Sequence, residues 1–186
     1  EKEPEWVGVD PSGHLLLVQS SVMGDAPCQG LWTYDIETGE PIHSIMAHDN
    51  PGSFGVSKEG RPYYLSTEVF ESTNTLYRSI VRHHIDDGSR QILGEPIPRG
   101  ALESVSCLGG PGTACIVSAR HNAGEAYQGK LWWLEEDETH TFIENHHASD
   151  CHYWGDAQAT VGPFGRYTFA THKGGCETIR SVIVNE

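Results

Sequence analysis

The feature that most constrains this chain is a fourfold repetition of short apolar segments joined by turns that contain glycine. In each repeat a short segment leads into such a turn, and a more apolar segment follows it. The four turns lie at residues 11–13, 58–60, 109–112 and 163–165. Glycine supplies the positive φ that a tight hairpin requires. The pattern therefore predicts a β-hairpin at the start of every repeat.

The later part of each repeat has a pattern of its own. After a variable loop comes a third segment in which large residues alternate, as in residues 31–36 and 131–136. A turn, at residues 37–39 in the first repeat and 86–88 in the second, then leads to a fourth segment. Regular short strands of this kind, without helical periodicity, are typical of sandwiches, barrels and propellers.

The spacing of the repeats selects among these folds. It is about 45–50 residues, which is the period of a propeller blade. We therefore predict an all-β fold without helices, a β-propeller of about four blades with four antiparallel strands each. The blades correspond to residues 5–50, 51–101, 102–154 and 155–186, within one propeller segment over residues 1–186.

The fourth repeat lacks a segment for its outermost strand, and residues 1–4 are too short to supply one. An open sheet edge is a site where another strand can pair. We expect the chain to be part of a larger propeller of about seven blades. The alternative is that a partner chain completes the ring.

Charge and hydropathy exclude two classes of partner. The chain has 26 acidic and 12 basic residues and a net charge of −14, whereas phosphate contacts need clustered lysine and arginine. A nucleic acid is therefore not an expected partner. No run of 18 apolar residues is present, so no membrane-spanning helix is expected. An acidic surface of this kind most often serves as a solvated face.

Polar residues gather where a propeller would bring strand ends together. The first two strands of a blade are antiparallel, so the start of one and the end of the other emerge on the same face, where the blade-to-blade connections also arrive. Loops on a rigid scaffold commonly carry function. The residues that this rule collects are His48, Asp49, Arg120, His121, Asn122, Glu125, Tyr127, Gln128, the stretch 146–156, His172, Lys173 and Cys176.

The five cysteines fit the same geometry. Cys107 and Cys115 flank the third glycine turn, and Cys151 and Cys176 flank the fourth, so each pair lies roughly opposite across a hairpin. One interpretation is two disulfides, with Cys28 unpaired. For the first pair, two buried free thiols are the alternative.

For the second pair a metal site is a further alternative. His146, Cys151, His172 and Cys176 would provide the two thiolates and two imidazoles of a closed tetrahedral zinc site. His147 and His152 lie nearby in the sequence and could replace either imidazole. The spacing is not that of a zinc finger, so a disulfide and a structural zinc site both remain open.

Two further expectations concern single residues. Trp32, Trp132 and Trp133 lie on third segments, where aromatic side chains would fill the space between blades. His83 and His84 precede the turn at residues 86–88, which predicts exposed side chains.

The fourth repeat, AQATVGPFGRYTFATH at residues 157–172, resembles a recurrent blade pattern of secreted bacterial propellers. Such blades occur in periplasmic translocation-type propellers and in seven-bladed polysaccharide lyases, including the ulvan and oligogalacturonate lyase families. The resemblance implies a secreted or periplasmic, carbohydrate-active protein. It extends over the blade pattern of the whole chain and carries information on fold more than on function.

Lyases of this type remove the proton α to a uronate carboxyl group, which requires a carboxylate neutraliser, a base and an acid. On the candidate face, Arg120 and His121 are the residues expected to neutralise the carboxylate or act as the base, and Tyr127 or Tyr153 is expected to act as the acid. The resemblance also implies a His/Cys metal site in some members. The candidate face has few basic residues, and a non-catalytic propeller that binds protein or glycan there is the alternative function.

Overall fold

The computed structural model describes residues 6–10, 13, 15–20, 30–46, 52–72, 75–98, 102–107, 110–119, 130–136, 140–145, 158–162, 166–172 and 179–184. Within these residues the chain forms strands and turns and contains no helix, which confirms the all-β prediction. Over the same residues, nothing in the structure is a helix with the length and hydrophobicity needed to cross a membrane.

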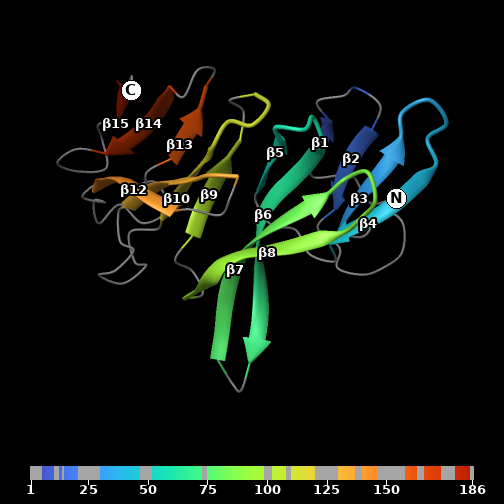
Figure 1. Ribbon diagram of the computed structural model, residues 1–186, viewed down its shortest axis with the longest axis horizontal. Coiled ribbons are helices and arrows are strands. Elements are labelled where there is room, and N and C mark those ends of the chain that lie inside the picture. The colour runs from blue at the N-terminus through green and yellow to red at the C-terminus, as the bar shows by residue number, and fades with distance from the viewer. Residues whose placement is uncertain are drawn as a thin grey trace.

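The strands form four antiparallel sheets that follow one another in sequence (Figure 1). Sheet A contains β1 (Trp6–Val9), β2 (Leu15–Ser20), β3 (Gly30–Asp35) and β4 (Pro41–Met46). Sheet B contains β5 (Gly52–Val56), β6 (Pro62–Ser72), β7 (Thr75–His84) and β8 (Arg90–Pro98). Sheet C contains β9 (Leu102–Ser106), β10 (Cys115–Ala119), β11 (Lys130–Leu134) and β12 (His140–Asn145). Sheet D contains β13 (Gln158–Val161), β14 (Tyr167–His172) and β15 (Ile179–Val184).

Every strand pairs with its neighbours in sequence, so each sheet is a simple meander. The glycines predicted to make the turns do so: Gly13, Gly39, Gly60 and Gly88 all have φ between 69° and 83°. A residue with a Cβ rarely adopts this conformation. The fourth predicted turn, at residues 163–165, lies outside the described residues.

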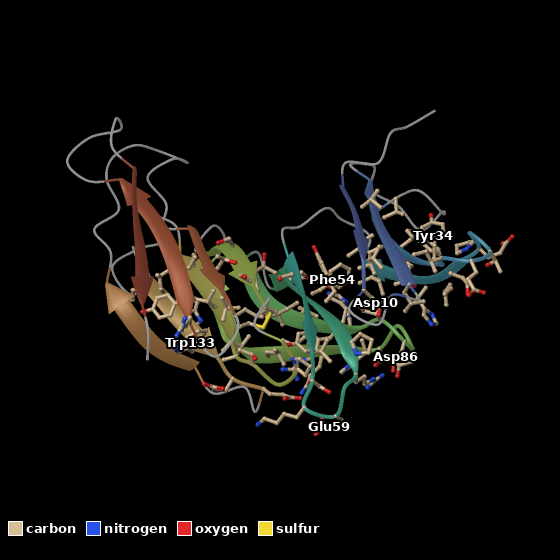
Figure 2. All side chains as sticks on the ribbon, turned by 90° about the horizontal axis from the view of Figure 1, so that it is seen from above. Asp10, Tyr34, Phe54, Glu59, Asp86 and Trp133 are labelled. Carbon is tan, nitrogen blue, oxygen red and sulfur yellow. A yellow bond between two sulfur atoms is a disulfide. The ribbon has the colours of Figure 1, made fainter. Side chains whose placement is uncertain are left out.

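Three apolar cores fill the spaces between successive sheets (Figure 2). Between sheets A and B the buried residues are Leu17, Leu31, Ile45, Tyr64 and Ile85. Between sheets B and C they are Tyr63, Leu65, Ile80, Leu93, Val105, Cys107, Cys115, Val117, Ala119, Trp132 and Leu134. Between sheets C and D they are Ile116, Leu131, Trp133, Ala159, Val161 and Tyr167.

Strand alternation explains how the middle sheets serve two cores at once. Successive side chains on a strand point to opposite faces. Tyr63 therefore packs toward sheet C and Tyr64 toward sheet A, while Trp132 packs toward sheet B and Trp133 toward sheet D. The Trp133 ring meets the Tyr167 ring edge-on, with centroids 5.3 Å apart. The prediction that Trp132 and Trp133 fill the space between sheets is confirmed.

Serine hydroxyl groups link the sheets where their first strands approach each other. The Ser53 Oγ accepts a hydrogen bond from the Cys107 N–H at 2.9 Å. The Ser106 Oγ accepts one from the Val161 N–H, and the Ser118 Oγ accepts one from the Ala159 N–H, both at 3.2 Å. The bond from Val161 places the end of β13 beside the end of β9, and the bond from Ala159 places the start of β13 beside the end of β10.

Candidate functional site

The segments that contain the predicted site residues join strands at one end of sheets C and D. Strands β10 and β12 run in the same direction, since both are antiparallel to β11. Ala119 and Asn145 therefore end at the same edge of sheet C. Ala159, near the start of β13, donates its N–H to Ser118, near the end of β10, so the start of β13 lies beside this edge of sheet C. Because β14 is antiparallel to β13, the end of β14 lies there as well. Residues 120–129, 146–157 and 173–178 all connect strands at this edge, which we call the loop end.

The structure does not describe the candidate side chains themselves. Arg120, His121, Tyr127 and Tyr153, predicted for catalysis, lie outside the described residues. The same holds for His146, Cys151 and Cys176 of the predicted metal site. His172 is the last residue of β14, where its backbone pairs with Ile179. Whether these residues converge stays a prediction, and so does the choice between zinc and a disulfide.

The register of sheet D bears on the second cysteine pair. Gln158 pairs with Ala170 and Val161 with Tyr167, so the β13–β14 hairpin is centred on residue 164, near where the turn was predicted. A hairpin with Cys151 directly opposite Cys176 would be shifted from this register by one residue. Such a shift moves a side chain to the other face of a sheet. Both cysteines lie outside the described residues.

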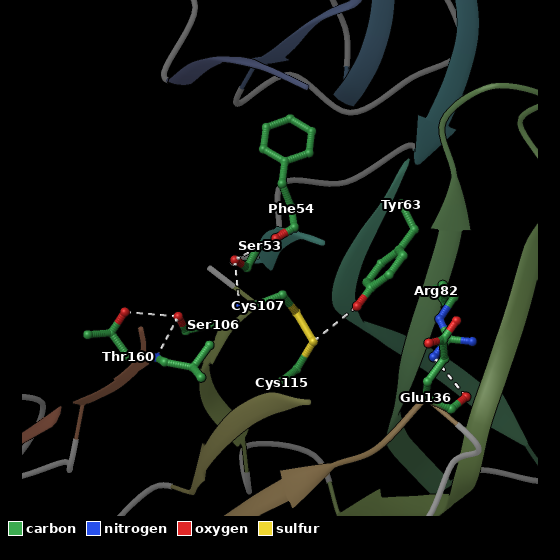
Figure 3. The surroundings of a disulfide bond; sticks show 10 residues. Ser53, Phe54, Tyr63, Arg82, Ser106, Cys107, Cys115, Glu136 and Thr160 are labelled. Carbon is green, nitrogen blue, oxygen red and sulfur yellow. Dashed lines mark hydrogen bonds between the residues drawn. A yellow bond between two sulfur atoms is a disulfide. The ribbon is translucent and has the colours of Figure 1, made fainter. Parts of the chain in front are cut away.

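The first cysteine pair forms a disulfide (Figure 3). Cys107 directly follows β9 and Cys115 begins β10, and their Cα atoms lie 4.3 Å apart. Ile116 pairs with Ser106 one step further along, so the two cysteines continue the register of the hairpin. The Tyr63 hydroxyl lies 3.4 Å from the Cys115 sulfur and must donate, because a disulfide sulfur has no proton. The disulfide interpretation of this pair is confirmed.

A buried polar network that the sequence analysis did not anticipate lies on sheet B. The side chain of His83 is 1% exposed, so the prediction that it is exposed was wrong. Its Nε2 lies 2.9 Å from the Glu68 Oε1 and 3.3 Å from the Ser66 Oγ. The other Glu68 oxygen accepts from the Arg90 Nη1 at 3.1 Å. Position in the strand could have revealed this burial, since His83 lies opposite the core residue Tyr64.

This Ser–His–Glu set is not arranged as a nucleophilic triad. In such a triad the hydroxyl and the carboxylate bind opposite nitrogens of the imidazole, so that a proton can pass from one side to the other. Here Ser66 and Glu68 approach the same nitrogen of His83. The arrangement satisfies buried polar groups within sheet B and supplies no activated nucleophile.

A second group of charges fixes sheet B to sheet C. Arg82 is 8% exposed and lies over the Tyr63 ring, with its Cζ 5.1 Å from the ring centroid. Its Nη2 donates to the Glu136 carbonyl at 3.3 Å (Figure 3). The Glu136 carboxylate accepts from the Lys58 N–H at 3.1 Å. Burial, as the largest cause, raises the pKa of Tyr63. These contacts hold the β11–β12 turn against sheet B at the edge opposite the loop end.

A third group joins sheet B to sheet A. The Arg61 Nε donates to the Asp86 Oδ2 at 2.8 Å, and Arg61 also pairs with Asp87. The hydrogen bond from Arg61 is the main cause that lowers the pKa of Asp86, whereas hydrogen bonds from Ser89 lower the pKa of Asp87 to about 2. The Asp86 carbonyl lies 3.2 Å from the His43 Nε2 on sheet A. This turn is therefore a junction between two sheets.

The charged groups of these three networks link strands and sheets to one another. No group of three or more His, Cys, Asp or Glu side chains within the described ranges could hold a metal ion. The loop end, formed by the connecting segments of sheets C and D, is thus the candidate functional site that topology supports. No protein-family model matches this chain, and no curated protein matches it in sequence.

Proposed function

We propose that this chain is a run of four blades of a β-propeller, and that it belongs to a secreted, carbohydrate-active protein. The fold proposal is supported by the order of the strands, since four meander sheets are stacked face to face with one apolar core in each space. Radial repetition of such sheets is the architecture of a propeller. The contacts of β9 with both β5 and β13 put the first strands of three sheets side by side.

The proposed site is the loop end, and one observation carries it. Three segments, at residues 120–129, 146–157 and 173–178, connect strands at that edge of sheets C and D, and together they contain four histidines, two tyrosines and two cysteines. Rigid sheets with functional loops gathered at one end are a common arrangement for binding. The buried Cys107–Cys115 disulfide supports an oxidising location, secreted or periplasmic.

The chemistry that fits these residue types is β-elimination on a uronate-containing glycan. Arg120 would neutralise the uronate carboxylate, and His121 would accept the proton α to it. Tyr127 or Tyr153 would donate a proton to the leaving glycosidic oxygen as the C–O bond breaks. The products would be a new reducing end and an unsaturated uronate. A zinc ion held by His146, Cys151, His172 and Cys176 would serve a structural role beside this site.

A glycan panel tests this proposal on the purified chain. The probes are polygalacturonate and ulvan, with neutral dextran as the control polymer. Binding is followed by affinity electrophoresis, and elimination by the ultraviolet absorbance of the unsaturated uronate. His121→Ala should lose elimination by about a hundredfold or more, the usual contribution of a general base. Lys58→Ala removes a positive charge at the opposite edge and should change neither readout.

A non-catalytic propeller that binds glycan or protein at the same loop end is the second candidate. The observation that favours this candidate is that charged groups such as Arg61, Arg82 and Glu136 link strands and sheets to one another. Glycan binding without an unsaturated product would support this candidate against the lyase. Absence of both binding and product with all the uronate glycans would overturn the carbohydrate proposal.

A further inference from the structure

The turn between β7 and β8 contains the one place in the sequence where an aspartate or asparagine directly precedes a glycine, at Asp87 and Gly88. This order of residues permits a reaction within the backbone. Glycine has no Cβ to hinder its own nitrogen, so the Gly88 nitrogen can attack the Cγ of the Asp87 carboxyl group. The turn therefore contains the groups for a covalent modification that needs no enzyme.

The modification takes two steps. First a bond forms between the Gly88 nitrogen and the Asp87 Cγ, and the amide proton leaves with the carboxyl hydroxyl as water, which closes a succinimide ring. Water then opens the ring at either carbonyl. Opening at Cγ restores aspartate, whereas opening at the main-chain carbonyl gives isoaspartate, in which the backbone runs through Cβ and is one atom longer. The first step uses the neutral carboxylic acid, because the carboxylate has no hydroxyl to lose.

Both reacting groups are engaged in the folded turn. The Gly88 N–H donates to the His84 carbonyl at 3.0 Å. The Asp87 Oδ1 accepts from the Ser89 N–H at 2.8 Å, and the Oδ2 pairs with Arg61. Hydrogen bonds, first from Ser89 and then from Arg61, lower the pKa of Asp87 to about 2, against an ordinary value of about 3.9. The neutral acid is therefore scarcer in the closed turn than in an open chain.

The isoaspartyl product does not fit the junction between sheets A and B. The Asp86 carbonyl lies 3.2 Å from the His43 Nε2, and a Cβ on Gly88 would lie 3.3 Å from the His43 ring, so the turn backbone packs directly against sheet A. The same turn is closed by the bond from the His84 N–H to the Ser89 carbonyl at 2.8 Å. An extra backbone atom between Asp86 and Ser89 displaces one contact or the other.

We propose that Asp87 is a site of spontaneous isomerisation, that the closed turn holds the reaction back, and that the isoaspartyl product loosens the junction between sheets A and B. The reaction then proceeds when the turn opens, and its product prevents the turn from closing again. A brief opening of this junction thereby becomes a permanent change in the chain. The proposal requires no glycan and is independent of carbohydrate binding.

Incubation of the purified chain at neutral pH in water labelled with heavy oxygen tests the first two parts. Ring opening adds one labelled oxygen atom, and trypsin in ordinary water then releases residues 83–90 as one peptide for mass spectrometry. A synthetic peptide of these residues should take up the label at least about tenfold faster than the folded chain, since one unit of pKa is a tenfold change in the neutral acid. Equal rates in peptide and folded chain would overturn the proposal.

Variants separate the two restraints. Arg61→Gln leaves the peptide of residues 83–90 unchanged, so a faster uptake in this variant arises from the fold. We expect a rise of at least about twofold, which a third of a pKa unit provides. Lys58→Gln, which removes a positive charge from the neighbouring β5–β6 turn, should leave the rate unchanged. Circular dichroism establishes that both variants are folded, and an unchanged rate in folded Arg61→Gln would overturn the role of this ion pair.

Asp87→Asn removes the ionisation, because its side-chain amide loses ammonia instead of water. The rate ratio between its own peptide and the folded variant then reports the bond from the Gly88 N–H to His84. We expect this ratio to exceed one but to be smaller than the ratio for the wild type. Ratios that are the same for both chains would overturn the restraint through the carboxylate, and a ratio of one for the variant would overturn the restraint through the Gly88 N–H.

Aged wild-type samples test the effect on the junction. Hydrogen exchange followed by mass spectrometry should give two populations for peptides of β4, and the share with fast exchange should equal the share of isoaspartate in the peptide of residues 83–90. Chromatography separates the isoaspartyl peptide from its aspartyl form. Peptides of β12 on sheet C serve as the control and should give one population. A single population for β4 in a sample rich in isoaspartate would overturn the proposed loosening.

Discussion

Glu68 is held by one buried and one exposed partner, which allows their contributions to stability to be separated. Replacing His83 by Leu leaves a largely buried carboxylate without its 2.9 Å partner. We expect the free energy of unfolding to fall by about 1–3 kcal/mol, the cost of an unsatisfied buried group. Replacing Arg90, whose side chain is 58% exposed, by Ala should cost less than about 1 kcal/mol. Urea denaturation measures both, and equal losses would contradict this ranking.

The Arg61–Asp86 pair makes a pH-dependent prediction. The folded-state pKa of Asp86 is lowered, mainly by the hydrogen bond from Arg61. The stabilisation is therefore fully present above the unfolded pKa of about 3.9 and is lost as the pH falls through the folded value. Arg61→Gln should reduce the melting temperature more at neutral pH than near pH 2, because Asp87, which also pairs with Arg61, has a pKa of about 2 and is partly protonated there. A loss of stability that is the same at both pH values would contradict the assignment.

At the scale of single residues, the sequence predicted the burial of apolar side chains correctly and that of a polar one wrongly. Trp132 and Trp133 were correctly predicted to fill the space between sheets. His83 was predicted to be exposed because a turn follows, yet it lies within β7, where alternation places it beside the core. The roles of Ser53 and Ser106 depend on contacts between separate repeats, and no local pattern reports such contacts.

At the scale of turns and strands, Gly39 and Gly88 occupy equivalent turns with φ of 72° and 69°. A Cβ at Gly39 would meet no atom within 4 Å, whereas a Cβ at Gly88 would lie 3.3 Å from the His43 ring of sheet A. Substitution by Ala should cost about 1–2 kcal/mol at either site, from the backbone conformation. Gly88→Ala should cost more, because it also disturbs the contact between sheets. Thermal unfolding of the two variants tests this, and equal costs would contradict it.

The turns could be predicted because glycine has a local conformational role, but strand lengths could not. A variable loop was expected between the second and third segments of each repeat. In sheet B the pairing instead continues to Ser72 opposite Thr75, and the β6–β7 hairpin extends well beyond the other strands (Figure 1). Register likewise depends on the whole hairpin, and the predicted Cys151–Cys176 pairing differs by one residue from the β13–β14 register.

At the scale of the whole molecule, the repeat predicted meander sheets in sequence order, and the structure contains them. The closure of a ring could not be derived, because it depends on the rotation between sheets and on what covers the end faces. The positions of the catalytic and metal candidates depend on the conformations of loops, which cannot be derived from loop composition. The loop end follows from strand direction alone, which is why it could be reached from the sequence.

Stacking predicts a gradient of local stability along the molecule. Among the described residues, sheet C contributes to two apolar cores and sheet A to one, so sheet A should open more readily. Strands β2 and β10 are a matched pair, since both are hydrogen-bonded to two neighbours. Amide hydrogens of β10 should exchange at least about tenfold more slowly than those of β2. Hydrogen exchange followed by mass spectrometry measures this, and equal rates would indicate a single cooperative unit.

The position of the disulfide sets an order of events during biosynthesis. Cys107 and Cys115 are separated by eight residues across one hairpin, so they can meet before any other sheet has formed. Once sheet B docks, Tyr63 covers the sulfur of Cys115 and both cysteines are 3% exposed. An oxidase that arrives after docking would find the thiols inaccessible. Formation of this disulfide should therefore be faster before sheet B docks than after it.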